Sequence, residues 1–401
     1  MRLTTFIATG LLAASGIAQA AQPVARVRVA FDRDAVTATH VEGLADVAAA
    51  RAVTADDPAR IASVSKLLLA IGVLRLVEQG KLSLDADASR YVGYTLRNRA
   101  FPDTPITLRM LLSHTSSLTD NAGYWAVPLD GDLRILTGDP RAWDLVNKPG
   151  TFFRYSNLNF PVIAGAIERA TSQRYDRFML EQVIRPLGLS ACPNWSGCDA
   201  AAYARAVVLY DAQGKAQVDD LKGKAPECVV RRARDGGCDI DRHWRAGANG
   251  AMFGPQGGMR ISANDLARVG RMLLNDGRLD GVQVLKPASV RALLTPVWTF
   301  DGRNGAIIEE DEPDRGGFFC SYGLAVQHLA SGDGKSCRDD LFGDGRRRMG
   351  HSGNAYGLLS GLWIDPQAGT GVAYFATGTS NASNGAHSAF SAVEEGLAAE
   401  R

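Results

Sequence analysis

Ser63 and Lys66 are the residues whose types and spacing point most directly to chemistry. They belong to the run Ser63-Val64-Ser65-Lys66, which opens a strongly apolar segment, residues 67–77. On a helix this spacing puts both side chains on one face, where the serine Oγ can meet the lysine ammonium. The helix N-terminus favours a developing negative charge, and a lysine among apolar residues is costly unless it is paired or loses its proton. The pattern predicts a serine nucleophile with a lysine partner; the competing interpretation is a helix cap followed by a lysine that extends its amine to solvent.

Tyr155 and Asn157 form a second candidate group, in a loop that follows the glycine-containing turn 148–150. A tyrosine beside Lys66 could be held as a phenolate, although its unperturbed pKa is about 10. Such a phenolate would take the Ser63 proton and return it to the leaving group. Asn157 could donate a side-chain N–H to a substrate carbonyl. The competing interpretation is a capped loop with a packed tyrosine.

The run His351-Ser352-Gly353-Asn354 is a third group, placed just before a β-rich segment. A small residue and a glycine at a strand edge allow a substrate backbone to approach closely. The backbone N–H of Asn354, together with that of Ser63, could form an oxyanion hole. His351 could instead be the base of a Ser-His-Asp triad, which is a rival mechanism. The sequence contains no Gly-x-Ser-x-Gly elbow, and this counts against an α/β-hydrolase.

The elements that must position these residues are strands at both ends of the chain and helices between them. The pattern predicts strands at residues 27–31, 37–44, 322–328, 357–364 and 371–377. Helices are predicted at residues 67–77, 107–112, 160–170, 175–184, 262–277 and 389–399. This order indicates one sheet built from both termini, with a helical lobe inserted in the middle.

Six cysteines lie in three sequence-local pairs, each spanning a polar, glycine-rich stretch. In an oxidising compartment locality favours the bridges Cys192–Cys198, Cys228–Cys238 and Cys320–Cys337, although other pairings stay open. Four of the six fall in the turn-rich segment 190–249, which we interpret as a surface insertion. A zinc site is the competing interpretation, but no Cys-x-x-Cys spacing is present.

The N-terminus has the pattern of a secretory signal, so we expect a secreted or periplasmic protein. Arg2 supplies the positive charge, residues 6–16 are a short apolar run, and Ala18-Gln19-Ala20 fits the cleavage pattern. Residues 1–20 would be removed, and the apolar run is too short to span a bilayer. A core helix or a membrane anchor is the alternative. The formal net charge of +1 gives no electrostatic argument for nucleic-acid binding.

The three groups resemble the signature elements of the class C β-lactamase and D-alanyl-D-alanine carboxypeptidase superfamily, which also contains esterases. Ser-x-x-Lys, Tyr-x-Asn and His-Ser-Gly occur once each, in that order. Other stretches are similar too, and they lie at residues 60–66, 111–116, 149–150, 185–189 and 256–274.

The resemblance implies an α+β fold in which an antiparallel sheet is flanked by helices and joined to an all-helical lobe. The sheet lobe would comprise residues 21–105 and 280–401, and the helical lobe residues 106–279, with the insertion at 190–249. The catalytic residues would be Ser63, Lys66 and Tyr155, with backbone amides of Ser63 and Asn354 as the oxyanion hole.

The implied activity is hydrolysis of a small amide, ester or peptidoglycan-type peptide through an acyl-enzyme. We expect no cofactor and no metal, and we expect a monomer. Substrate contacts would come from Asn157, His351, Ser352 and Gly353. A β-lactamase and a non-catalytic protein that binds penicillin or cell-wall fragments are the alternatives.

One departure from the family pattern bears on the substrate. Class C β-lactamases carry lysine where this chain has His351, and histidine is a poorer fixed cation at neutral pH. Histidine resembles the peptidase and esterase branches instead. The run Arg346-Arg347-Arg348 could hold a substrate carboxylate, although a solvated charge run is the favoured interpretation. Three further residues have less defined roles: Tyr124 and Trp125 as cleft residues, and His114 as a packing or turn residue.

Overall fold

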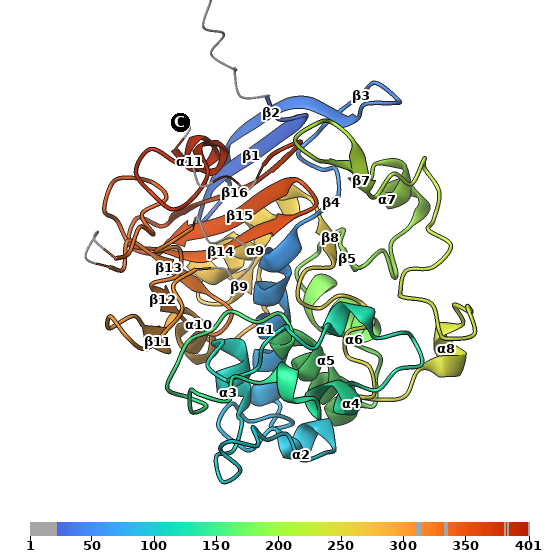
Figure 1. Ribbon diagram of the computed structural model, residues 1–401. Helices are drawn as coiled ribbons and strands as arrows, with labels where there is room; N and C mark the ends of the chain where they lie inside the picture. Colours follow the sequence, from blue (N-terminus) through green and yellow to red (C-terminus); the bar gives the residue numbers. More distant parts are fainter. Residues whose placement is uncertain (1–21, 309–314, 333–335, 381, 383–384, 400–401) are drawn as a thin grey trace, which may run out of the picture.

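A nine-stranded antiparallel sheet, built from the two ends of the chain, organises the described residues of the computed structural model (Figure 1). The structure describes residues 22–308, 315–332, 336–380, 382 and 385–399, so the predicted signal segment lies outside them. The strand order is β11-β12-β13-β14-β15-β16-β1-β2-β3. Their bounds are β1 Ala25–Asp32, β2 Val36–Asp46, β3 Arg51–Ala52, β11 Trp298–Thr299, β12 Ser321–Tyr322, β13 Gln327–Leu329, β14 Arg348–Ala355, β15 Leu358–Asp365 and β16 Thr370–Thr377. The prediction of one sheet from both termini is confirmed.

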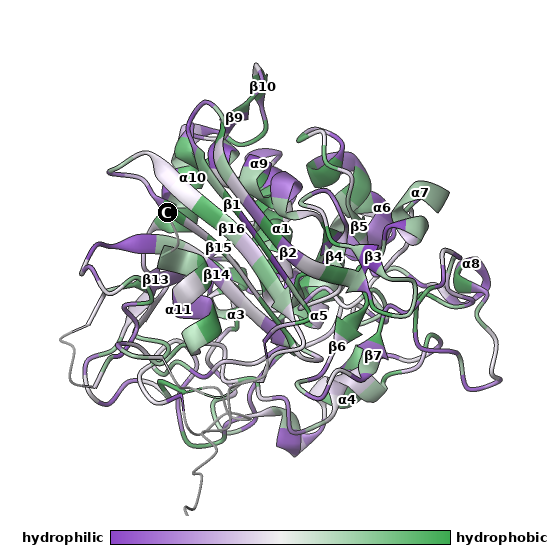
Figure 2. Ribbon diagram, turned by 90° about the horizontal axis from the view of Figure 1, so that it is seen from above, coloured by the Kyte–Doolittle hydropathy of each residue, from purple (hydrophilic) through white to green (hydrophobic). Residues whose placement is uncertain are grey.

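Helices cover both faces of this sheet, which is why every residue of β15 is buried. On one face α9 (Ala263–Leu274) packs so closely that a Cβ at Gly270 would lie 2.2 Å from the Phe31 ring. On the other face the C-terminal α11 (Ala392–Ala399) accepts a hydrogen bond from Arg28 at the carbonyl of Leu397. Figure 2 shows α9 and α11 on opposite sides of the strands. The predicted helical lobe included the residues of α9, whereas the structure places this helix against the sheet.

Helix α1 (Ser65–Glu78) lies at the centre of the molecule, between the sheet and the helices that follow (Figure 1). Its apolar residues are buried on nearly all sides, as predicted. The side chain of Ser262 caps α9 and that of Thr107 caps α3. The remaining helices are α2 Ser89–Val92, α3 Leu108–Leu112, α4 Leu133–Thr137, α5 Asn159–Thr171, α6 Tyr175–Met179, α7 Ala200–Ala204, α8 Ile240–His243 and α10 Pro287–Leu294. The predicted helix 175–184 is α6 continued by a π turn, Leu180–Ile184.

One strand prediction was wrong, and one strand was not predicted. Residues 322–328 form the reversal between β12 and β13, where Gly323 N donates to Val326 O at 2.7 Å and Ala325 has a φ of +57°. His351 to Asn354 lie inside strand β14, which was not among the predicted strands. The hairpin turn comes later, at Tyr356 and Gly357, which both have a positive φ.

The segment 190–249 contains the two predicted disulfides Cys192–Cys198 and Cys228–Cys238, and the third predicted bridge, Cys320–Cys337, is also present. Part of this segment belongs to the core and not to the surface. Strand β5 (Cys192–Pro193) pairs with β8 (Met259–Ile261), which in turn pairs with β4 (Ala59–Arg60). Two short hairpins complete the strands, β6 Leu209–Tyr210 with β7 Ala216–Val218, and β9 Arg278–Leu279 with β10 Val282–Gln283. Among the described residues, none of the helices has the length and apolar character needed to cross a membrane.

Candidate active site

Ser63 lies in the 3₁₀ turn Ala62–Val64, directly before α1, and its Oγ accepts a hydrogen bond from Lys66 Nζ at 2.8 Å. The structure therefore brings together the predicted serine and lysine. Ala62 has a φ of +43°, which is uncommon for a residue other than glycine. The turn is held on two sides, because Ile61 N donates to Met259 O and Ser65 Oγ donates to Ala62 O.

Lys66 is fully buried, and its ammonium points at neutral oxygens. Besides Ser63 Oγ, Nζ donates to Asn157 Oδ1 at 2.9 Å and to the backbone oxygen of Gln256 at 2.8 Å. The ammonium also lies 5.0 Å from the centre of the Tyr155 ring, within the range of a cation–π contact. Three segments distant in sequence thus meet at one charged group.

Tyr155 is held by stacking on both faces of its ring. His114 stacks on one face, with ring centres 4.2 Å apart and an interplanar angle of 25°. Phe319 stacks against Tyr155 with centres 4.8 Å apart and an angle of 13°. The Nδ1 atom of His114 accepts a hydrogen bond from the backbone N–H of Ser156 at 3.0 Å, and Nδ1 therefore carries no proton. Burial, followed by the charge of Lys66, lowers the pKa of His114 well below its usual range.

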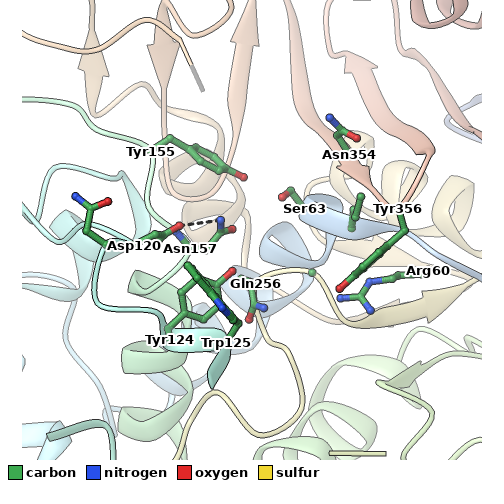
Figure 3. A pocket seen from close by; sticks show the side chains of 14 residues that line it. Arg60, Ser63, Asp120, Tyr124, Trp125, Tyr155, Asn157, Gln256, Asn354 and Tyr356 are labelled. Atoms are coloured by element: carbon green, nitrogen blue, oxygen red, sulfur yellow. Dashed lines mark hydrogen bonds between the residues drawn. The ribbon is translucent and has the colours of Figure 1, made fainter. Parts of the chain in front are cut away.

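Asp120 organises the loop that carries Tyr155 and Asn157, and it was not predicted from the sequence. One carboxylate oxygen accepts from Ser156 Oγ and Leu158 N, both at 2.9 Å. The other accepts from Asn157 N at 3.0 Å and from Asn157 Nδ2 at 2.9 Å (Figure 3). Asn157 is therefore fixed between Asp120 and Lys66. The sequence feature that could have pointed to Asp120 is its position, four residues after the family-like stretch that ends at residue 116.

His351 is buried and does not line the cavity beside Ser63. Its Nε2 faces the Tyr322 hydroxyl at 2.6 Å, and its Nδ1 faces the backbone oxygen of Ser352. Burial, with a smaller effect of the Lys66 charge, lowers the pKa of His351 to about 3. Both ring nitrogens are thus occupied and the ring is neutral, which argues against His351 as the base of a Ser-His-Asp triad.

The other residues of β14 differ in their placement. Asn354 lines the cavity, whereas Ser352 and Gly353 do not. A Cβ at Gly353 would lie 2.5 Å from Ile61 O and 3.2 Å from Ser63 N. Glycine is required here because β14 passes directly against the turn that carries the serine.

A cavity of about 620 Å³ opens beside Ser63 (Figure 3). Tyr155, Asn157 and Asn354 lie around it with Ser63, so four predicted residues share one cavity. Tyr124 and Trp125, the two candidate cleft residues, also line it. The lining includes Arg60, Gln256 and Tyr356, which were not singled out by sequence. Arg346 and Arg348 line a different cavity, where they pair with Asp365 and Asp344.

Comparison with known proteins decides the family. A family model described as beta-lactamase matches residues 13–395. The chain belongs to the beta-lactamase family. The curated relatives of this beta-lactamase family member include esterase EstB of Burkholderia gladioli, 34% identical over 173 residues, which are 38% of this chain and 42% of that protein. They also include the D-alanyl-D-alanine-carboxypeptidase/endopeptidase AmpH of Escherichia coli K12, 31% identical over 140 residues, 33% of this chain and 36% of that protein.

The matched segments thus span less than half the length of these two relatives. Solved structures extend the likeness over the whole fold. A penicillin-binding protein homologue from Pyrococcus abyssi has a TM-score of 0.63 at 19% identity, covering 88% of this chain and 70% of that one. The D-amino acid amidase of Ochrobactrum anthropi SV3 has a TM-score of 0.60 at 18% identity, covering 93% and 91%. The protein is a member of a hydrolase family with the serine β-lactamase fold.

Proposed function

We propose that the protein is a serine hydrolase that forms an acyl-enzyme on Ser63 and hydrolyses a small amide or ester. The single observation that supports this most is the 2.8 Å contact between Lys66 Nζ and Ser63 Oγ at the edge of an open cavity. Tyr155 and Asn157 line the same cavity. The names of the relatives, an esterase, a carboxypeptidase/endopeptidase and an amidase, favour amide and ester substrates.

In the proposed reaction Ser63 Oγ attacks the substrate carbonyl carbon and its proton passes to Tyr155, which the charge of Lys66 holds as a phenolate. Backbone amides of Ser63 and Asn354 hold the negative oxygen of the tetrahedral intermediate. The intermediate expels an amine or an alcohol, which leaves with a proton from Tyr155. Water then gives a proton to Tyr155 and attacks the acyl-enzyme carbonyl; the bond between Ser63 Oγ and the acyl group breaks, the carboxylic acid leaves, and Tyr155 returns the proton to the serine. Asp120 keeps Asn157 in place, and Asn157 in turn accepts from Lys66.

Labelling with a fluorescent fluorophosphonate tests the proposal. We expect the wild-type protein to be labelled and the Ser63→Ala variant to remain unlabelled. Ser190→Ala is the matched control, because this exposed serine precedes β5 and lies outside the cavity. Equal labelling of Ser63→Ala and wild type would contradict the assignment. Labelling without turnover of p-nitrophenyl esters, D-amino-acid p-nitroanilides or a chromogenic β-lactam would favour a protein that binds without releasing product.

We further propose export. The three disulfides support this, because such bridges persist in oxidising compartments. Mass spectrometry of the protein purified from the periplasm or the medium tests it, with a mature N-terminus near Ala21 expected. An intact N-terminus in a protein found only in the cytoplasm would contradict it.

A further inference from the structure

Two arginines lie directly opposite each other in the β4–β8 pair, and their surroundings differ. Arg260 is buried and has a full set of partners. Its guanidinium bonds both oxygens of Asp219, at 2.7 and 3.1 Å, and Asn194 Oδ1 at 2.6 Å. Arg60, its neighbour across the pair, lines the Ser63 cavity instead.

Arg60 has no carboxylate partner among the residues that the structure describes. Its Nε is buried without a hydrogen-bond partner there, and its guanidinium lies 4.9 Å from the centre of the Tyr356 ring. Burial, and then the charge of Arg260, lowers the pKa of Arg60 to about 10. Arg60 therefore stays protonated at neutral pH, and the aspartate that acts on it, Asp219, is already bonded to Arg260.

The other charged groups of this region are occupied. Asp120, which also lines the cavity, accepts four hydrogen bonds from the loop 156–158. Lys66 donates to three oxygens behind Ser63. Within the described part of the chain, the positive charge that faces the cavity without compensation is that of Arg60. Aromatic side chains around it, including Tyr124 and Tyr356, lower the local dielectric constant.

We propose that Arg60 binds a carboxylate of the substrate, so that the preferred substrates are amides or esters that carry a carboxylate near the reacting carbonyl. A guanidinium fork matches a carboxylate in geometry and charge. Arg60 is three residues from Ser63, and three residues of chain span at most about 11 Å, so one small substrate can reach both. This inference rests on the proposed function of Ser63. It assigns to Arg60 the task that neutral, buried His351 cannot perform.

A matched pair of esters tests the proposal. The mono-p-nitrophenyl ester of glutaric acid carries a carboxylate, and p-nitrophenyl pentanoate has the same chain length without it. In Arg60→Gln we expect kcat/KM for the carboxylated ester to fall at least about tenfold further than for the neutral ester, chiefly through KM. Arg60→Lys should restore part of the difference. Arg346→Gln removes an arginine outside this cavity and is the charge-matched control.

If Arg60→Gln lowers kcat/KM equally for both esters, so that the preference for the carboxylated ester is unchanged, the proposed role of Arg60 would be overturned. A binding measurement keeps this separate from the chemistry of Ser63. Calorimetry with glutarate should show binding to Ser63→Ala and at least about tenfold weaker binding to Ser63→Ala/Arg60→Gln. Glutarate binding equally to both would overturn the proposal even if Ser63 is acylated. If the wild-type protein is not labelled by fluorophosphonate but does bind glutarate, the acyl-enzyme is rejected while the carboxylate site at Arg60 is still supported.

Discussion

At the scale of single residues, the contacts of Lys66 bear most directly on the proposed loss of the Ser63 proton. The ammonium is buried, bonds the serine oxygen and lies 5.0 Å from the centre of the Tyr155 ring. We expect Lys66→Ala and Tyr155→Phe each to slow acylation by about 10²-fold or more, because general acid–base groups contribute at least that much. The rate of fluorophosphonate labelling, or the burst with a p-nitrophenyl ester, measures this. Rates near wild type in both variants would remove the proposed proton path.

His351 is the residue for which the structure reverses an expectation. The class C pattern by itself favours a gain in β-lactam turnover from His351→Lys, because lysine is a fixed cation. The ring is buried beside Tyr322, and no carboxylate of the described residues acts on it, so a lysine ammonium there would lose its hydration without compensation. We therefore expect His351→Lys to lower the free energy of unfolding by about 2 kcal/mol or more, without a gain on lactams. Denaturant unfolding checks the first part; stability equal to wild type with faster lactam hydrolysis would contradict it.

At the scale of elements, the contact between strand β14 and the Ser63 turn sets the geometry of the site. Ser360 Oγ on β15 also donates to Ile61 O at 2.9 Å, so the sheet holds this turn directly. We expect Gly353→Ala to push the turn away from β14, because its Cβ would meet Ile61 O at 2.5 Å and Ser360 Oγ at 2.4 Å. Stability should fall by about 1–3 kcal/mol, and acylation should slow.

The control for this change is Gly316→Ala, where an added Cβ meets no atom within 4 Å. Its stability and labelling rate should stay near wild type. If Gly353→Ala behaves like this control, β14 does not position the serine. A crystal structure of Gly353→Ala would show the displacement of residues 61–63 directly.

The Cys320–Cys337 bridge also supports the site at this scale. It anchors Cys320, the neighbour of Phe319, and Phe319 stacks on Tyr155. Replacing both cysteines by serine should cost about 3 kcal/mol of stability and should also reduce kcat. The Cys228–Cys238 bridge in the segment 190–249 is the matched comparison, since its loss should affect stability with less effect on kcat. Thermal unfolding and ester hydrolysis separate the two effects. Equal kcat values in both double variants would argue against support of Tyr155 by this bridge.

At the scale of the whole molecule, buried histidines make stability depend on pH. Burial lowers the pKa of His328 to about 4 and of His351 to about 3, and it lowers that of His114 as well. The unfolded chain takes up protons at these groups near pH 6.5, while the folded chain does not, so stability falls below that pH. Burial raises the pKa of Glu168 to about 7, which offsets part of the loss because the folded state holds that proton.

We expect the free energy of unfolding to fall by about 2 kcal/mol between pH 7.5 and 5.5, because the loss from three histidines exceeds the gain from one glutamate. The midpoint of thermal unfolding measured across this range checks it. His328→Asn, outside the Ser63 cavity, should make the dependence shallower. A midpoint that does not change with pH would show that these histidines are protonated in the folded protein.

The sequence by itself determined the parts of this protein that depend on local patterns. Ser63 and Lys66 share a helix turn, so their meeting follows from helical periodicity. The apolar run 67–77 required a buried helix, and cysteines close in sequence formed the bridges that locality favours. The family resemblance came from the same short motifs.

Only the tertiary structure decided which distant side chains compensate one another. Asp120 could not be recognised in advance, because its four hydrogen bonds come from a loop more than thirty residues away. His351 was expected at the substrate, and burial beside Tyr322 placed it behind the site. Arg60 differs from Arg260 in that Asp219 forms its ion pair with Arg260. Burial and charge compensation depend on every element packed around a group, and for this reason no local pattern specifies them.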